Sequence, residues 1–231
     1  MGLFNRTSKN LPTFWKNYEN LFKETQSKNF KELTFVVLDT ETTGFSFKDD
    51  RILSIGAVKI KDGTISVQEV FDSYLEQEKF SKETVHIHGL LKNGQRECIS
   101  EILALEKFLA YVGNAIIVAH HAGFDIGMLN NALERHGLPK LKNTVLDTGV
   151  IYKKTLIKSY LVQPKPNYTL DELAEKFSIS RKDRHTALGD AYITAVAFLK
   201  ITSRLKEKKT FPSNICLDKL KGFPNNLKHF Y

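Results

Sequence analysis

The chain has 231 residues, of which 42% are hydrophobic, and this is enough for one well-packed α/β core with extensions. No apolar run approaches the roughly 20 residues that span a bilayer, and the start of the chain lacks the apolar core of a signal peptide. The two cysteines, Cys98 and Cys216, form no CxxC pair, so we expect reduced thiols, a cytoplasmic location and no structural zinc.

The formal charge of +8 is concentrated at the two ends of the chain. Residues 1–32 carry a net charge of +3 and residues 200–231 a net charge of +6, which leaves −1 for the stretch between them. Basic ends attract phosphate backbones, but solubilising tails would have the same composition. Charge therefore supports nucleic-acid binding without deciding it.

The predicted elements begin with an amphipathic helix over residues 13–24, where aromatic and leucine side chains recur at helical spacing. A strand follows at 33–38. Two further strands are joined at 61–63, where Lys-Asp-Gly favours a hairpin.

The second half of the chain alternates helical and extended patterns. They are expected at residues 99–112 (helix), 115–120 (strand), 125–136 (helix), 144–148 (strand), 169–177 (helix, with a capping box from Thr169 to Glu172) and 186–205 (helix). Three meandering strands followed by this alternation predict a mixed α/β sheet of five strands with helices on both faces.

Two acids directly follow the apolar strand at 33–38. Asp39 and Glu41 are two residues apart, so on a strand they project to the same face while Thr40 points away. An unpaired charge beside a buried run is unfavourable by several kcal/mol. One cation could satisfy both carboxylates.

Three other polar residues each lie next to a core element. Asp125 opens a helix after the strand at 115–120, a position where an acid also stabilises a helix dipole. Asp190 lies in the last helix, five residues after His185, and five residues turn a helix through about 500°, so His185 is expected in the preceding loop. Alone, each would be an ordinary loop or helix residue. Together with Asp39 and Glu41 they give carboxylate ligands suited to Mg²⁺ or Mn²⁺.

This ordered set resembles the DEDDh family of 3′→5′ exonucleases, which includes the epsilon proofreading subunit of bacterial DNA polymerase III. The likeness covers roughly residues 33–200 and is carried by three motifs: VVLDTETTG, VAHHAGFDIGML and RHTALGDA. It implies an RNase H-like fold, with an exonuclease domain at 33–205 between an N-terminal helical extension (1–32) and a basic C-terminal extension (206–231).

The resemblance also implies a role for each acid. Two Mg²⁺ or Mn²⁺ ions would clamp the scissile phosphate, held by four carboxylates: Asp39, Glu41, Asp125 and Asp190. Asp39 would bridge the two ions. His185 would accept the proton of the attacking water, because the ordinary histidine pKa of about 6.5 lies near working pH. The product would be a nucleoside 5′-monophosphate.

Four further residues are nominated for the terminal nucleotide. By the resemblance, Thr42 and Thr43 would contact it, and His88, in the segment HIHGL, would flank its sugar or base together with Phe124. Aromatic stacking tolerates any base sequence. The two threonines are equally typical of a turn, and a phenylalanine before a helix is often part of the core.

The leading hypothesis is a DNA exonuclease that acts on a single-stranded or frayed 3′ end in proofreading, repair or end trimming. An RNase T-like or oligoribonuclease-like RNA exonuclease would share the motifs, because sugar discrimination depends on contacts to the 2′ position. A non-catalytic module that binds a polymerase is a third hypothesis, although all five catalytic positions are occupied. The sequence leaves open the oligomeric state and whether the chain is a polymerase subunit or acts alone. We expect no membrane partner.

Overall fold

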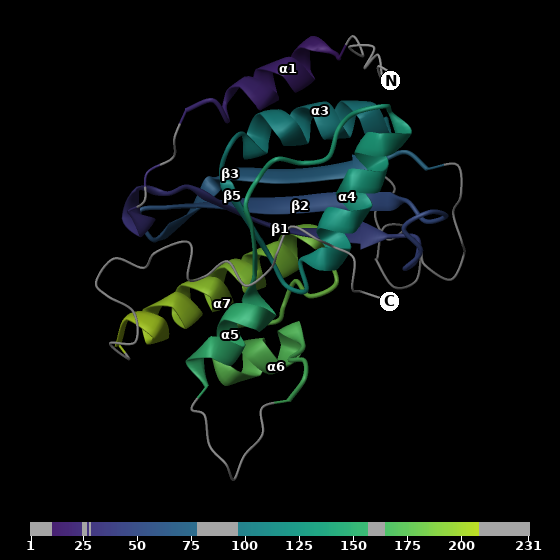
Figure 1. Cartoon of the computed structure of the whole chain (residues 1–231). Helices are drawn as coiled ribbons and strands as arrows, with labels where there is room; N and C mark the ends of the chain where they lie inside the picture. The colour runs from purple at the N-terminus through teal and green to yellow at the C-terminus, as the bar shows by residue number, and fades with distance from the viewer. Residues whose placement is uncertain (1–10, 25–26, 28, 78–96, 157–164, 208–231) are drawn as a thin grey trace, which may run out of the picture.

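The computed structural model describes residues 11–24, 27, 29–77, 97–156 and 165–207. They form one mixed sheet, with strand order β4-β3-β2-β1-β5-β6 and helices on both faces (Figure 1). β1 pairs antiparallel with β2, and β2 with β3, whereas β5 is parallel to β1 and β6 to β5. The strands are β1 (Phe35–Thr42), β2 (Ile52–Lys61), β3 (Thr64–Leu75), β4 (Cys98–Ile99), β5 (Ile116–Ala119) and β6 (Val145–Asp147).

The predicted mixed sheet is confirmed, but it has six strands where the sequence predicted five. The additional strand is β4, whose two residues pair in parallel with the end of β3. A segment of two residues has no hydrophobic period, so it forms a strand only because β3 offers its edge. Cys98 in β4 is exposed.

Two layers of helices cover the sheet (Figure 1). One face carries α1 (Thr13–Asn20), α3 (Glu101–Val112) and α4 (Gly123–Arg135); the other carries α5 (Thr148–Thr155), α6 (Leu170–Lys176) and α7 (Ala187–Glu207). A 3-10 turn at Phe30–Glu32 precedes β1. The five predicted helices are all present with shifted ends, whereas α5 was not predicted.

α5 escaped prediction because its start depends on a cap rather than on an apolar period. The carboxylate of Asp147 accepts hydrogen bonds from the backbone N–H groups of Gly149 and Val150, at 2.8 and 3.2 Å. Asp147 therefore ends β6 and begins α5 at the same residue.

β1 is the central element of the core, as its apolar sequence predicted. Val36 and Leu38 pack into the cluster beneath α3 and α4, whereas Phe35 and Val37 pack into the cluster beneath α5 and α7. All four side chains are at most 2% exposed. This alternation follows from the two-residue period of a strand.

Two local predictions are also confirmed. The turn between β2 and β3 has left-handed backbone at Asp62 (φ 52°) and Gly63 (φ 72°), which suits a two-residue hairpin. Thr169 and Glu172 form the predicted capping box at the start of α6. Both features lie where the short-range sequence signal is strongest.

α1 packs against the core through its aromatic side chains. Trp15 is fully buried, and the hydroxyl of Tyr18 donates to Asn143 Oδ1 at 2.6 Å. Figure 1 shows α1 lying above α3 at the top of the molecule. Within the described ranges, no helix combines the length and apolar character needed to cross a membrane.

Candidate active site

The first two predicted acids lie at the carboxyl end of β1. Asp39 and Glu41 are half-buried and share one face of the strand, while Thr40 between them is buried. The pairing of β1 with β2 shifts register between Glu41 and Thr42. Such a bulge bends a strand and re-aims its side chains, so the ladder becomes irregular where the acids stand.

Asp125 is held beside these acids by Thr40. The backbone N–H and the hydroxyl of Thr40 both donate to Asp125 Oδ1, at 2.9 and 2.8 Å. Asp125 lies in the first turn of α4 and is 4% exposed. The residue between the two β1 acids therefore joins the end of the strand to the start of the helix.

Asp190, in the first turn of α7, completes a cluster. One carboxylate oxygen from each of Asp39, Glu41 and Asp190 lies within 4.8 Å of the other two. Asp125 is outside this group, but its charge raises the pKa of both β1 acids. The structure thus brings three of the four predicted ligands together and places the fourth nearby.

Gly56 explains why α7 can approach the acids so closely. It pairs with Asp39 across the β1–β2 ladder. A Cβ atom at Gly56 would lie 2.1 Å from the backbone nitrogen of Leu188 and 2.2 Å from the carbonyl carbon of Ala187. Only glycine admits this contact between β2 and the first turn of α7. The sequence analysis missed this role, although a glycine inside a strand pattern is a known sign of close backbone approach.

Burial and mutual repulsion raise the pKa values of the acids. For Glu41, burial is the largest cause, followed by the charges of Asp190 and Asp125, and the pKa rises to about 7. Burial and the same repulsion hold the pKa of Asp39 well above its usual range. Burial also raises the pKa of Asp125 to about 7, although hydrogen bonds from Thr40 oppose the rise. A cation placed among these groups would remove the penalty.

A basic side chain that the sequence analysis did not nominate reaches the cluster. Nη1 of Arg184 donates to Asp190 Oδ2 at 2.5 Å, while Asp190 Oδ1 is buried without a hydrogen-bond partner. Burial raises the pKa of Asp190, and the charge of Arg184 opposes this rise. Arg184 is the first residue of the motif RHTALGDA, but the motif gave no role to it.

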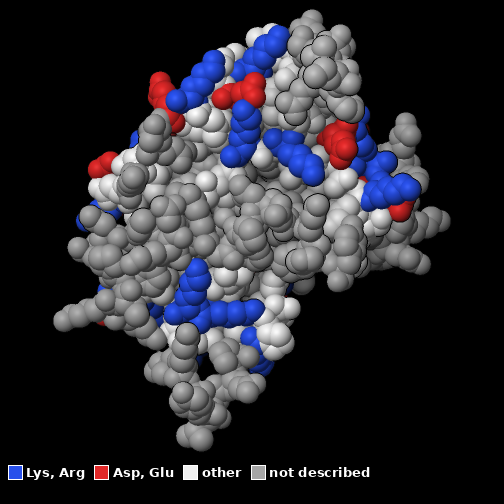
Figure 2. All heavy atoms as spheres, in the orientation of Figure 1, with Lys and Arg blue, Asp and Glu red and all other residues white. Residues whose placement is uncertain are grey.

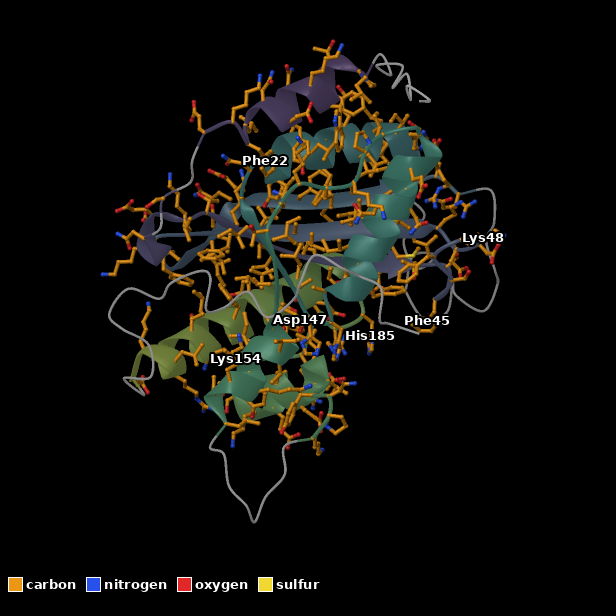
Figure 3. All side chains as sticks on the ribbon, viewed as in Figure 1. Phe22, Phe45, Lys48, Asp147, Lys154 and His185 are labelled. Atoms are coloured by element: carbon orange, nitrogen blue, oxygen red, sulfur yellow. The ribbon has the colours of Figure 1, made fainter. Side chains whose placement is uncertain are left out.

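His185 lies in the loop before α7, as predicted (Figure 3). It is exposed, and its φ of 66° is in the left-handed region. Its proximity lowers the pKa of the Asp190 carboxyl, against the larger effect of burial. A left-handed residue other than glycine is uncommon and costs about 1 kcal/mol or more, so the surrounding loop imposes it.

Of the residues nominated for the terminal nucleotide, the two threonines shape the turn after β1. The hydroxyl of Thr42 donates to the carbonyl of Gly44 at 2.8 Å, and that of Thr43 donates to Asp50 Oδ1 at 2.7 Å. Their hydroxyls are therefore engaged within the protein. His88 lies outside the described residues.

Phe124 belongs to a group of three phenylalanines next to the acids. Its half-buried ring lies 5.8 Å, centroid to centroid, from both Phe45 and Phe47. Phe45 is 89% exposed, an unusual state for so large an apolar ring. Phe124 directly precedes Asp125 in the first turn of α4.

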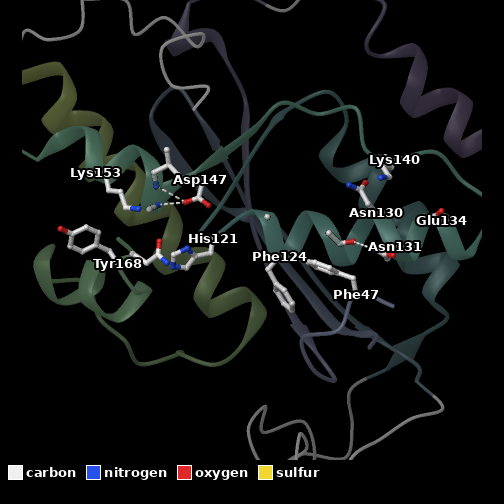
Figure 4. Close-up of a pocket in the computed structure, with 15 residues that line it drawn as sticks. Phe47, His121, Phe124, Asn130, Asn131, Glu134, Lys140, Asp147, Lys153 and Tyr168 are labelled. Carbon is white, nitrogen blue, oxygen red and sulfur yellow. Dashed lines mark hydrogen bonds between the residues drawn. The ribbon is translucent and has the colours of Figure 1, made fainter. Parts of the chain in front are cut away.

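A groove of about 800 Å³ extends from Phe124 along one face of α4 (Figure 4). Aromatic rings, amides and two lysines line it: Phe47, Phe124, Tyr168, Asn130, Asn131, Asn167, Lys140 and Lys153, with His121, Glu134, Asp147, Val150 and three glycines. The α4 members recur at helical spacing from Gly123 to Glu134, a length of about 16 Å. The sequence analysis did not predict this groove, because its two walls are far apart in the chain.

A half-buried histidine connects two segments next to the groove. His120 contacts the hydroxyl of Thr148 at 2.8 Å and the carbonyl of Tyr168 at 2.9 Å. Since a carbonyl only accepts, Nε2 carries a proton. Burial, with the nearby His121, lowers the pKa of His120 to about 4.

A mixed sheet with a carboxylate cluster at the end of its central strand defines the class of RNase H-like nucleases. Within that class, the chain belongs to the exonuclease family, whose RNase_T model matches residues 36–198. The resemblance that the three motifs predicted is confirmed. The family match covers β1 with Asp39 and Glu41, α4 with Asp125, and the first turn of α7 with Asp190.

Relatives with similar sequences are DNA polymerases. A PolC-type DNA polymerase III from Caldanaerobacter subterraneus subsp. tengcongensis is 36% identical over 185 residues, which cover 79% of this chain and 12% of the relative. The PolC-type DNA polymerase III of Clostridium perfringens is 37% identical over 176 residues, covering 75% and 12%. The chain thus spans only 12% of the length of the curated relatives it matches.

Solved structures share the fold at low sequence identity. E. coli Exonuclease I in complex with a dT13 oligonucleotide has a TM-score of 0.62 at 16% identity, over 77% of this chain and 42% of that chain. Cell-death related nuclease 4 has a TM-score of 0.63 at 12% identity, over 75% and 64%. These likenesses confirm the predicted RNase H-like fold.

Proposed function

We propose that the chain is a divalent-metal-dependent exonuclease that hydrolyses DNA from the 3′ end in proofreading or repair. The observation that carries this proposal is the convergence of Asp39, Glu41 and Asp190, whose oxygens lie within 4.8 Å of one another. PolC-type polymerases among the relatives and the oligonucleotide bound to Exonuclease I support DNA as the substrate. The proposal also includes a cytoplasmic location and the division of the chain at residues 33 and 205.

The cluster fits a divalent cation. Three carboxylates converge, one buried oxygen of Asp190 lacks a hydrogen-bond partner, and no thiolate stands among them. Oxygen donors of this kind suit Mg²⁺ or Mn²⁺. Two such ions would be held by Asp39, Glu41, Asp125 and Asp190. When bound, they supply Lewis-acid chemistry, which polarises the phosphate, activates water and neutralises the leaving oxygen.

The protein's own groups would position the substrate and move the proton. His185 would accept the proton of the attacking water from its exposed place before α7. The water oxygen bonds to phosphorus, and the bond from phosphorus to the 3′ oxygen of the preceding nucleotide breaks. A nucleoside 5′-monophosphate leaves, and the 3′ oxygen of the shortened strand takes a proton from solvent to become a hydroxyl.

The terminal nucleotide would be bound mainly by ring stacking. Phe124, with Phe45 and Phe47 beside it, offers aromatic faces next to the acids. Thr42 and Thr43 would contact the nucleotide through their backbone, because their hydroxyls are bonded within the turn. His88 keeps its role from the family resemblance.

The groove along α4 and the basic surface near it favour a single strand as substrate. The groove begins at Phe124, the residue before Asp125, and offers rings that can stack on unpaired bases and amides that can bond to them. Figure 2 shows Lys and Arg side chains gathered over α5, whose last turn carries Lys153 and Lys154. A duplex would hide the base faces that such a groove contacts.

Digestion of matched oligonucleotides tests the proposal. Single-stranded DNA and RNA with the same base sequence and a 5′ label are incubated with Mg²⁺, Mn²⁺ or EDTA. We expect a ladder that shortens from the 3′ end of DNA, requires metal and is lost in Asp39→Ala by at least about 10³-fold. Glu106→Ala, an exposed acid on α3, is the matched control and should cleave normally.

The same experiment separates the alternatives. Faster shortening of the RNA would favour an RNA exonuclease. Absence of cleavage in both strands, from a folded protein that binds metal, would favour a non-catalytic polymerase partner. Cleavage by Asp39→Ala at the wild-type rate would refute the assignment of the site.

A further inference from the structure

The guanidinium of Arg184 bridges two carboxylates on different helices. Its Nη1 donates to Asp190 Oδ2 at 2.5 Å, and its Nε and Nη2 donate to the two oxygens of Asp171 at 2.9 and 3.1 Å. Asp171 lies in the first turn of α6 and Asp190 in the first turn of α7. The bridge therefore connects a helix outside the acid cluster to one of the cluster's own members.

This bridge places a fixed positive charge against the cluster. The side chain of Arg184 is 19% exposed and that of Asp190 is 7% exposed, so water screens their attraction weakly. A guanidinium stays charged at any working pH. Arg184 thus neutralises Asp190 through Oδ2, while the buried Oδ1 is left without a partner.

Asp171 and Asp190 compete for the guanidinium of Arg184. The Asp171 pair is bidentate, the geometry in which a guanidinium and a carboxylate match best, whereas the contact with Asp190 uses one nitrogen. Arg181 also approaches Asp171, at 3.9 Å, but its side chain is 58% exposed. Among the described residues, no ion pair joins Arg181 to Asp190.

We infer that Arg184 is a positioning residue that takes the place of a cation at Asp190 and so limits how tightly the cluster binds a divalent metal. Without metal, the guanidinium balances Asp190. With metal bound, the ion pair with Asp171 would hold Arg184 in place, and Oδ1 of Asp190 would be available to the ion. The inference rests on the proposed role of Asp190 as a metal ligand.

Two substitutions on this bridge should change Mn²⁺ binding in opposite directions. Free Mn²⁺ is followed by electron paramagnetic resonance during titration of the full chain. Arg184→Gln removes a competing charge, so the dissociation constant should fall by about tenfold. Asp171→Asn leaves Arg184 to pair with Asp190 alone, so the constant should rise by about threefold. Arg181→Gln, the matched control, should leave it unchanged.

The metal-free protein gives an independent measurement. In EDTA, Arg184→Gln leaves Asp190 without its counter-charge, so its melting temperature should fall by about 5 °C. Arg184→Lys keeps the positive charge but cannot form the bidentate pair, so its melting temperature should fall less. If Arg184→Gln does not fold, the weaker Mn²⁺ binding expected of Asp171→Asn, against unchanged binding in Arg181→Gln, carries the test.

An unchanged or weaker Mn²⁺ affinity in Arg184→Gln would overturn the inference, and so would an unchanged or tighter affinity in Asp171→Asn. Asp190→Asn distinguishes this failure from a failure of the proposed function. If Asp190→Asn binds Mn²⁺ as the wild type does, Asp190 is not a ligand and the metal site itself is misassigned. If it binds weakly, the site stands and only the role of Arg184 is in question.

Discussion

The sheet face under α1 and the edge of the sheet that carries the acids differ in how their buried polar groups are paired. Under α1, Trp15 is fully buried, and the hydroxyl of Tyr18 both donates to Asn143 and accepts from the backbone of Lys142. At the acid edge, three carboxylates are buried or half-buried close together. Each region also holds one buried polar atom without a hydrogen-bond partner, Trp15 Nε1 under α1 and Asp190 Oδ1 at the acid edge. The first arrangement stabilises the fold, whereas the second weakens it until a cation binds.

Within one sheet, the residues under α1 should therefore determine stability, and the acids should determine catalysis. Substitutions under α1 should lower the free energy of unfolding and leave catalysis intact in the molecules that remain folded. Substitutions among the acids should abolish catalysis and leave the fold unchanged or more stable. The predictions below test this separation, from the largest expected change in free energy to the smallest.

Trp15→Ala should have the largest effect on stability. The side chain is 0% exposed, and truncating a buried tryptophan lowers the free energy of unfolding by about 3–5 kcal/mol. Urea denaturation measures the loss, and kcat at low temperature should equal that of the wild type. Asn17→Ala, an exposed position on the same helix, is the control. A large loss of kcat in folded Trp15→Ala would contradict the separation.

His120→Gln should change the pH dependence of stability. The folded pKa of about 4 lies below the unfolded value of about 6.5, so between these values the unfolded chain binds the proton and the folded chain does not. Stability from this group is complete above pH 6.5 and is lost as the pH falls toward 4, by up to about 3 kcal/mol. Urea denaturation at pH 7.5 and 5 should show a smaller loss in His120→Gln. Equal losses in the two proteins would show that His120 is not the titrating group.

Gly56→Ala links the two regions, because β2 belongs to the core and α7 carries Asp190. The new Cβ would lie 2.1 Å from a backbone atom of Leu188, so the first turn of α7 must shift. We expect a loss of about 2 kcal/mol in stability and a larger loss in exonuclease activity. Both are measured on the same preparation. Wild-type activity would mean that the approach of α7 does not position the acids.

Glu41→Gln should stabilise the metal-free protein. The folded pKa of about 7 lies above the unfolded value, so the folded chain keeps a proton that the unfolded chain releases, and stability falls as the pH rises through this window. At pH 8 in EDTA, the substitution should raise the free energy of unfolding by about 1 kcal/mol, with little change at pH 5. Exonuclease activity should be lost. Destabilisation at pH 8 would show that the carboxylate is not under repulsion.

The sequence predicted the parts that depend on local pattern. The apolar run of β1, the acids that follow it and the loop position of His185 could be placed because strand and helix periods fix which side chains share a face. The motif order then identified Asp125 and Asp190 as partners, and the structure brings Asp190 to the β1 acids.

The features that depend on contacts between elements far apart in the chain could not be predicted. Gly56 matters only because α7 packs on β2, and Arg184 only because α6 supplies Asp171. β4 and α5 lack a periodic pattern of their own, and the groove along α4 needs Tyr168 from another part of the chain. Each of these features arises from packing in the folded chain, so no local sequence pattern indicates it.

The order of the acids along the chain has a consequence during synthesis on the ribosome. Asp39 emerges in an early strand, whereas Asp190 is made only with the last described helix, which then packs on Gly56. A nascent chain that has not yet released α7 holds an incomplete cluster. Nuclease activity should therefore appear only when translation has passed this helix, so that prematurely terminated fragments pose no hazard to nucleic acid in the cell.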